Sequence, residues 1–332
     1  MIPLSILDLS PVRAGATTAD ALANTRALAQ HAERHGYRRF WLAEHHGMPG
    51  IASSATSVLI GHVADHTESI RVGAGGVMLP NHSPLVIAEQ FGTLATLHPG
   101  RIDLGLGRAP GTDPATARAL RHDLRAAFAF ADEVAELRSY FHPAPGQQVR
   151  ARPWEGVDVP VWILGSSTDS ARLAAAQGLP YSFASHFAPG QLMPALALYR
   201  ENFTPSEVLE RPYVMVGMNA VVAETDEEAA HLFTSQQVAF RNVRRGRPGQ
   251  LAPPVERIEL GPGEAHMLGE VLAVSAVGSP ETVRRGLEQV RDATGADEFI
   301  VASQIYDFEA MKRSYELLAQ VRDSMTPGDV AA

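Results

Sequence analysis

The chain has 332 residues, a formal net charge of −9 and no cysteine. The absence of cysteine excludes disulfides, thiolate metal sites and cysteine nucleophiles. The acidic balance, without any basic run, argues against nucleic acid and anionic membranes as partners. No apolar run approaches the roughly 20 residues that span a bilayer, and the first residues lack the pattern of a secretory signal. We therefore expect a soluble cytoplasmic protein.

Strand and helix patterns alternate along the chain. Short apolar runs bounded by glycine or proline predict strands, and longer amphipathic stretches predict helices. The predicted strands lie at 4–9, 40–43, 70–80, 101–108, 159–167, 181–186, 213–222 and 297–303. The predicted helices lie at 17–36, 54–67, 84–97, 115–141, 169–177 and 191–203, with two more beginning near 226 and 279 and a last one at 308–324.

Eight strands, each followed by a helix and without an intervening linker, predict an α/β fold of one closed (β/α)8 TIM barrel. We expect a single domain over residues 1–332, with loop insertions over the C-terminal face near 142–158 and 243–275. Within the second insertion, the stretch 246–263 holds four prolines and four glycines and is long enough to act as a lid.

The apolar run 40–43 leads directly into Glu44, His45 and His46. In a parallel barrel the carboxyl ends of the strands carry the chemistry, and ionisable side chains buried there cost free energy unless they are paired. The two histidines therefore indicate a functional site. For Glu44 alone, a hydrogen-bonded corner that holds the loop is an equally good explanation.

Glycines within the third predicted strand, at positions 73, 75 and 76, suggest a second part of the site. Glycine in a strand permits a bulge or the close approach of a flat ligand to the backbone. It also simply makes room for a bulky core neighbour, and the sequence leaves both explanations open.

Two segments suggest an anion site. The glycines at 105–111 resemble a dinucleotide loop, but Pro110 and Pro114 delay the helix that such a loop requires. Arg108, at the end of the fourth strand, suits an anionic ligand or an ion pair with a nearby acid. Gly165, Ser166 and Ser167 precede a helix whose free amides could bind an anion, although hydroxyl caps without a ligand are common.

Together these segments resemble the bacterial luciferase-like monooxygenase family, nearly from end to end. The resembling stretches are 41–46, 72–84, 88–90, 98–101, 105–108, 164–167 and 313–319. The resemblance implies a barrel that binds reduced FMN, or the deazaflavin F420 in some branches, at its C-terminal face. It also implies reaction of the reduced flavin with O2 to a C4a-peroxide, which oxygenates a small organic substrate.

The resemblance further implies roles for single residues. His45 matches the catalytic histidine, with Glu44 and His46 as its neighbours in the motif. Gly75 and Gly76 match a pair joined by a non-prolyl cis peptide beneath the isoalloxazine ring. The flavin-phosphate ligands are matched by Arg108 and Ser166, with Gly165 and Ser167 adjacent. Gly107 stands where luciferase itself has a reactive cysteine, so light emission is not expected.

The implied partners follow from the same resemblance. No second nucleotide-binding domain is visible, so a separate NAD(P)H:flavin reductase would supply FMNH2. Family members pair subunits through the helices at 54–67 and 84–97, which predicts a homodimer. These helices carry the apolar residues Val58, Leu59, Ile87, Phe91, Leu94 and Leu97.

Three alternatives remain at this point. The first is F420-dependent hydride transfer on the same fold. The second is a metal-dependent barrel hydrolase that uses His45, His46 and His186. The third is a flavin-binding protein without turnover. The substrate class also stays open, among an aldehyde, a ketone, a sulfonate and a polyketide-like aromatic.

Overall fold

The computed structural model describes residues 2–109, 111–120 and 126–325. Its core is a barrel of eight parallel strands in which β1 to β7 follow one another, β9 lies beside β7, and β1 closes the ring against β9. The barrel strands are β1 Leu4–Asp8, β2 Arg39–Leu42, β3 Arg71–Met78, β4 Ile102–Gly107, β5 Val161–Gly165, β6 Tyr181–Phe183, β7 Val214–Val222 and β9 Glu298–Ala302. This arrangement confirms the predicted TIM barrel.

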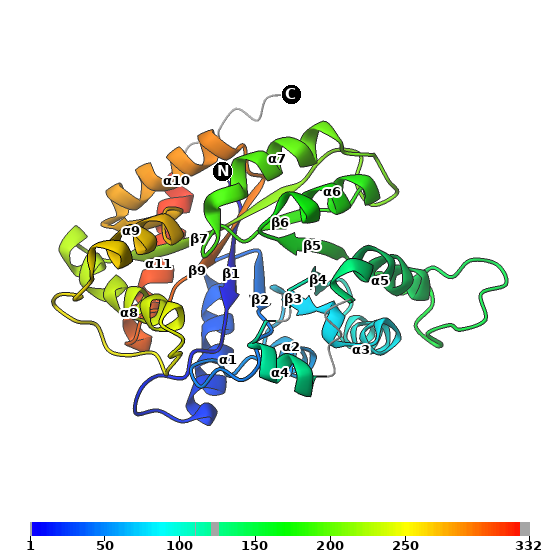
Figure 1. The fold of residues 1–332 in the computed structure, drawn as a ribbon, viewed down its shortest axis with the longest axis horizontal. Helices are drawn as coiled ribbons and strands as arrows, with labels where there is room; N and C mark the ends of the chain where they lie inside the picture. The colour runs from blue at the N-terminus through cyan, green and yellow to red at the C-terminus, as the bar shows by residue number, and fades with distance from the viewer. Residues whose placement is uncertain (1, 110, 121–125, 326–332) are drawn as a thin grey trace.

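Helices surround the barrel and connect successive strands (Figure 1). They are α1 Thr18–Arg34, α2 Thr56–Asp65, α3 Pro84–Leu97, α4 Pro114–Ala119, α5 Ala126–Phe141, α6 Thr168–Gln177, α7 Leu192–Glu201, α8 Asp226–Arg244, α9 Pro262–Val271, α10 Pro280–Thr294 and α11 Phe308–Ser324. The predicted capping box of α1 is present, because the Thr17 hydroxyl accepts from the Asp20 backbone amide and the Asp20 carboxylate accepts from Thr17.

The region between α8 and α10 differs from the prediction. A ninth strand, β8 (Ser275–Gly278), pairs with the C-terminal half of β7 from Asn219 onward. Helix α9 precedes it, so part of the stretch expected to be loop is helical. β8 is only four residues long and α9 begins with Pro262 and Gly263, a pair typical of turns, which explains why both elements were missed.

The helix predicted over 115–141 is described in two pieces. The first piece, α4, begins after Asp113, whose carboxylate accepts hydrogen bonds from the Ala115 and Thr116 amides, and ends at Ala119. The second piece, α5, begins at Ala126. The predicted connection through 121–125 lies outside the described residues.

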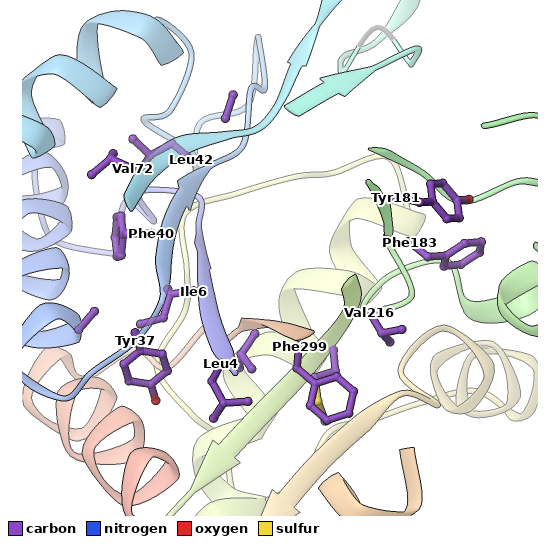
Figure 2. Close-up of a cluster of buried hydrophobic side chains, with 14 of the residues drawn as sticks. Leu4, Ile6, Tyr37, Phe40, Leu42, Val72, Tyr181, Phe183, Val216 and Phe299 are labelled. Carbon is purple, nitrogen blue, oxygen red and sulfur yellow. The ribbon is translucent and has the colours of Figure 1, made fainter. Parts of the chain in front are cut away.

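Alternate side chains of the strands face the helices and form the main core. Figure 2 shows this outer layer, in which Leu4 and Ile6 of β1, Phe40 of β2 and Phe299 of β9 are fully enclosed. Tyr37 packs edge-on against Tyr315 of α11 and donates its hydroxyl to the Tyr315 carbonyl. Burying these large apolar surfaces holds the helices against the barrel.

The other set of side chains points into the barrel and is stacked in layers along its axis. At the N-terminal end lies an ion network: Asp103 accepts from Arg39 at 2.7 Å and from Arg71 at 2.6 Å. Arg39 also contacts Glu298, which accepts from the Ser5 hydroxyl. Above this network lies an apolar layer that contains Leu7, Trp41, Trp162, Met215 and Ile300. The lower half of the barrel therefore carries a charged layer with an apolar layer above it.

The ion network generates a stability prediction. Asp103→Ala should destabilise the protein by about 3–5 kcal/mol, because it leaves the buried Arg39 guanidinium without one of its two counter-charges. The matched control is Asp65→Ala, since Asp65 is largely exposed and its contact with His98 is 3.5 Å long. Urea unfolding of both variants at neutral pH gives the comparison. Equal midpoints for the two variants would show that the network does not stabilise the barrel.

Candidate active site

A cavity of about 520 Å³ opens at the C-terminal end of the barrel. Each of the eight barrel strands contributes to the wall of this cavity. Small residues, such as Gly217 of β7 and Ala302 at the end of β9, leave the space unfilled. Part of the predicted lid lies over it: Pro248, Gly249 and Leu251 line the cavity. The Leu251 backbone is tied to the loop after β1, to the Val12 carbonyl and the Ala14 amide.

The sequence left two explanations for the glycines of β3, namely core packing and the close approach of a flat ligand. The expected non-prolyl cis peptide is present between Gly75 and Gly76, and both residues line the cavity. A Cβ atom on Gly75 would lie 2.6 Å from a Leu7 methyl, and one on Gly76 would lie 2.7 Å from the Gly105 carbonyl. The contact at position 76 is with backbone, so packing alone requires glycine there. At position 75 the nearest atom is the end of a flexible side chain, so packing does not by itself exclude a larger residue. Both glycines leave a flat surface on the cavity wall.

Glu44 lies at the centre of a hydrogen-bonded corner between two loops. Its carboxylate accepts from His46 Nε2 at 2.8 Å, from His82 Nε2 at 2.9 Å and from the Met78 amide at 3.1 Å. Burial opposes ionisation, but the hydrogen bonds from His82, His46 and Met78 outweigh it and hold the pKa of Glu44 below its usual value. The carboxylate thus connects the loop after β2 to the segment after β3. Sequence reasoning found Glu44 and His46 but missed His82, which is 38 residues away in the chain.

His45 differs from its two neighbours because its ring faces the cavity. Its Nδ1 atom is enclosed and has no hydrogen-bond partner among the described residues. Desolvation lowers the pKa of His45 to about 4, although the nearby Glu44 carboxylate acts in the opposite direction. The imidazole is therefore neutral at pH 7 and faces the space that a ligand would fill.

A second imidazole, His186, lines the cavity from the loop after β6. β6 lies opposite β2 in the barrel order, so His186 and His45 approach from opposite walls. Burial lowers the pKa of His186 to about 4, and the charge that His45 would carry lowers it further. Sequence reasoning considered His186 only as a metal ligand. Its place, at the end of the strand predicted over 181–186, was the signal for a cavity role.

Arg108 is the only formally charged side chain among the described residues that line the cavity. Its Nη1 donates to the Asp169 carboxylate at 3.3 Å, and Arg172 lies 3.4 Å from the same carboxylate. The ion pair that the sequence offered as an alternative is therefore present. Arg108 remains about 43% exposed, so its guanidinium can also reach a ligand.

The start of helix α6 lies next to Arg108. Ser167 is the N-cap residue, but its side chain caps no amide, while the Thr168 amide donates to Gln191 at 3.3 Å. Ser170 donates to the Ser167 carbonyl within the first turn. Gly165, Ser166 and Ser167 all line the cavity. The positive end of the helix dipole and a guanidinium thus meet at one edge of the cavity, an arrangement that suits a phosphate.

Comparisons with known proteins identify the family of this chain. The sequence profile of a family described as luciferase-like monooxygenase matches residues 2–298. The chain is 54% identical to the protein YvbT of Bacillus subtilis over 96% of each chain. It is 51% identical to a luciferase-like monooxygenase of Escherichia coli over 98% of each. A more distant relative, 34% identical over 96% of this chain and 98% of its own, is the N-acetyl-S-alkylcysteine monooxygenase of Bacillus subtilis.

Solved structures share the fold. Apo-MsnO8 superposes with a TM-score of 0.91 at 35% identity and covers 98% of this chain and all of its own. The oxygenating constituent of 3,6-diketocamphane monooxygenase from Pseudomonas putida, solved with FMN, has a TM-score of 0.74 at 18% identity over 99% of each chain. An F420-dependent secondary alcohol dehydrogenase has a TM-score of 0.71 at 13% identity over 96% of this chain and 98% of its own. The chain belongs to the luciferase-like monooxygenase family.

Proposed function

We propose that this family member is an FMN-dependent monooxygenase that receives reduced FMN from a separate NAD(P)H:flavin reductase and oxygenates a small organic substrate with O2. The observation that carries the proposal is the division of one cavity into two ends. One end presents Arg108 and an open helix start, and the other presents the neutral imidazole of His45. A phosphorylated cofactor and an uncharged reaction centre would fit these two ends.

FMN fits the residues at the charged end. A terminal phosphate would accept hydrogen bonds from the guanidinium of Arg108 and from the hydroxyls or amides of Ser166 and Ser167. The flat surface at Gly75 and Gly76 lies on β3, next to β4, so it suits the ring of the same molecule. When bound in its reduced form, FMN would supply the electrons for activating O2.

The charge of the cavity favours FMN over F420. F420 continues beyond its phosphate into a tail with several carboxylates, whereas FMN ends in the phosphate. The described cavity wall offers one cation, Arg108, and that cation already shares Asp169 with Arg172. A polycarboxylate tail would require more positive charge than this wall provides.

We also assign different roles to the three residues of the Glu-His-His motif, because their side chains have different surroundings. We assign His45 the catalytic role, because its ring faces the cavity and its neutral form can donate and accept a proton. Glu44 and His46 act as positioning residues, since their side chains bond each other and Glu44 also bonds His82. Because His46 bonds Glu44 and does not line the cavity, it is not placed to bind a metal ion there with His45 and His186, as a barrel hydrolase would require.

The proposed homodimer rests on fewer residues than the sequence indicated. Leu59, Ile87, Phe91 and Leu94 are buried against the barrel in this chain alone. Val58 of α2 and Leu97 of α3 remain 73% and 66% exposed, and Val86 of α3 is exposed at 44%. Exposed apolar side chains on two neighbouring helices suit a two-fold contact with a second copy of the chain.

The phosphate assignment predicts that Arg108→Ala weakens FMN binding by about 1.5–3 kcal/mol, the scale of a charge-assisted hydrogen bond. Arg172→Ala is the matched control, because Arg172 contacts the same Asp169 carboxylate but does not line the cavity. Fluorescence titration of FMN with both variants measures the difference. The same FMN affinity in Arg108→Ala as in the parent protein would remove Arg108 from the site.

The role of His45 predicts that His45→Ala binds FMN within about 1 kcal/mol of the parent, because other residues hold the cofactor. Substrate oxygenation should fall about 100-fold or more, the usual contribution of a positioned acid–base group, while release of hydrogen peroxide rises. His62→Ala serves as the control and should leave oxygenation unchanged, since it removes a histidine of α2 that does not line the cavity. Oxygenation by His45→Ala at the parent rate would end the assignment.

The dimer predicts that the double variant Val58→Asp, Leu97→Asp is a monomer by light scattering at micromolar concentration, because carboxylates would have to be buried in the contact. Val208→Asp, which places the same charge at another exposed apolar position, should leave the mass unchanged. A monomeric parent protein under these conditions would contradict the proposal.

A further inference from the structure

The cavity holds a second polar group that the proposed function does not use. Away from Arg108, four polar side chains line one wall: His186 after β6, Asn219 of β7, Gln236 of α8 and Gln304 after β9. They come from four separate elements, so the fold brings them together. None of them carries a formal charge when the histidine is neutral.

Two of the three side-chain amides in this cluster are occupied by bonds to the protein. Asn219 donates to the His186 carbonyl at 2.8 Å and accepts from Gln236 Nε2 at 2.6 Å. Gln236 in turn accepts from the Gln304 amide at 3.3 Å. Asn219 and Gln236 are also almost fully buried. They therefore form a fixed frame, and this frame holds the backbone of His186 in place.

The imidazole of His186, in contrast, makes no hydrogen bond to the part of the chain that the structure describes. Its Nδ1 atom is enclosed, without a hydrogen-bond partner among the described residues, and lies beside Gly217, where a Cβ atom would be 2.6 Å away. A buried N–H without an acceptor costs more than a bare lone pair, so the proton belongs on Nε2. Nε2 lies on the side of the ring away from Gly217. His186 thus presents to the cavity an N–H donor that a bound ligand can satisfy.

Apolar side chains make up much of the remaining wall. Leu9, Ile51, Phe187, Phe240 and Val243 line the cavity, and Phe187 packs edge-on against the His186 ring. The low pKa values of His186 and His45 keep both rings uncharged at neutral pH. With Arg108 assigned to the cofactor, an anionic substrate group would be buried without a counter-charge.

We propose that His186 is a substrate-binding residue whose Nε2–H donates to the acceptor oxygen of a neutral, largely apolar substrate, such as a ketone. The proposal rests on the proposed function only in assigning Arg108 to the cofactor phosphate. If His186 has this role, carboxylates and sulfonates are poor substrates. The preference for a neutral substrate then comes from the cavity wall that carries His186.

The test uses the protein loaded with oxidised FMN, so that no turnover occurs, and three probes of one chain length: octan-2-one, octanoate and octane. Calorimetry at neutral pH should show octan-2-one binding at least about tenfold more tightly than octanoate, because the carboxylate has no counter-charge. In His186→Phe, octan-2-one should bind about fivefold to tenfold more weakly, the loss of one neutral hydrogen bond, while octane binding is unchanged.

Two further variants make the result specific. His186→Gln keeps an N–H donor and should recover part of the ketone affinity, whereas His62→Phe changes a histidine of α2 outside the cavity and should have no effect. Equal affinities for octanoate and octan-2-one, an unchanged ketone affinity in His186→Phe, or no ketone binding by the parent would each overturn the proposal. A parent protein that fails to load FMN would instead contradict the proposed function, and the same titrations without cofactor would still test His186.

Discussion

The ion network at the closed end of the barrel is the interaction on which the rest of the structure depends. Asp103, Arg39, Arg71 and Glu298 come from four strands, and Ser5 of β1 and the Tyr213 hydroxyl before β7 also bond to Glu298. Charges this deeply buried are tolerated only when each has its partner at the right distance. The network therefore specifies how six strands meet at one end, and leaves the other end free to carry function.

The open end follows from a change in side-chain size along the barrel axis. TIM barrels usually fill their interior with layers of branched side chains. Here the layer of Trp41, Trp162 and Met215 is followed by positions such as Gly217 and Ala302, so the last layer is a cavity. Because burial disfavours the charged forms of the two imidazoles, His45 and His186 act at neutral pH as uncharged donors and acceptors.

The sequence was sufficient for the barrel because the signal is periodic and repeated eight times. It was also sufficient for residues that directly follow a strand, such as His45 and Arg108, since the carboxyl ends of parallel strands converge. It could not separate the roles within the motif at 44–46. The bond from His82 to Glu44 and the position of His45 at the cavity both depend on how the loops after the strands meet in space. Likewise, nothing in the pattern of β6 shows that the frame of Asn219 and Gln236 leaves the His186 ring unbonded.

Asp169 has a consequence for the proposed cofactor cycle. Asp169 lies in the first turn of α6, and its carboxylate already accepts a hydrogen bond from the guanidinium of Arg108. An incoming phosphate would exchange with this internal anion rather than fill a vacant positive site, so its gain in free energy is the difference between two ion pairs. If a phosphate displaced Asp169 in this way, its departure would let Asp169 return, and Arg108 would keep a counter-charge. Such an exchange would lower both the affinity for the phosphate and the barrier to its release. This would suit an FMN cofactor that leaves in its oxidised form after each turnover and is reduced again by a separate enzyme.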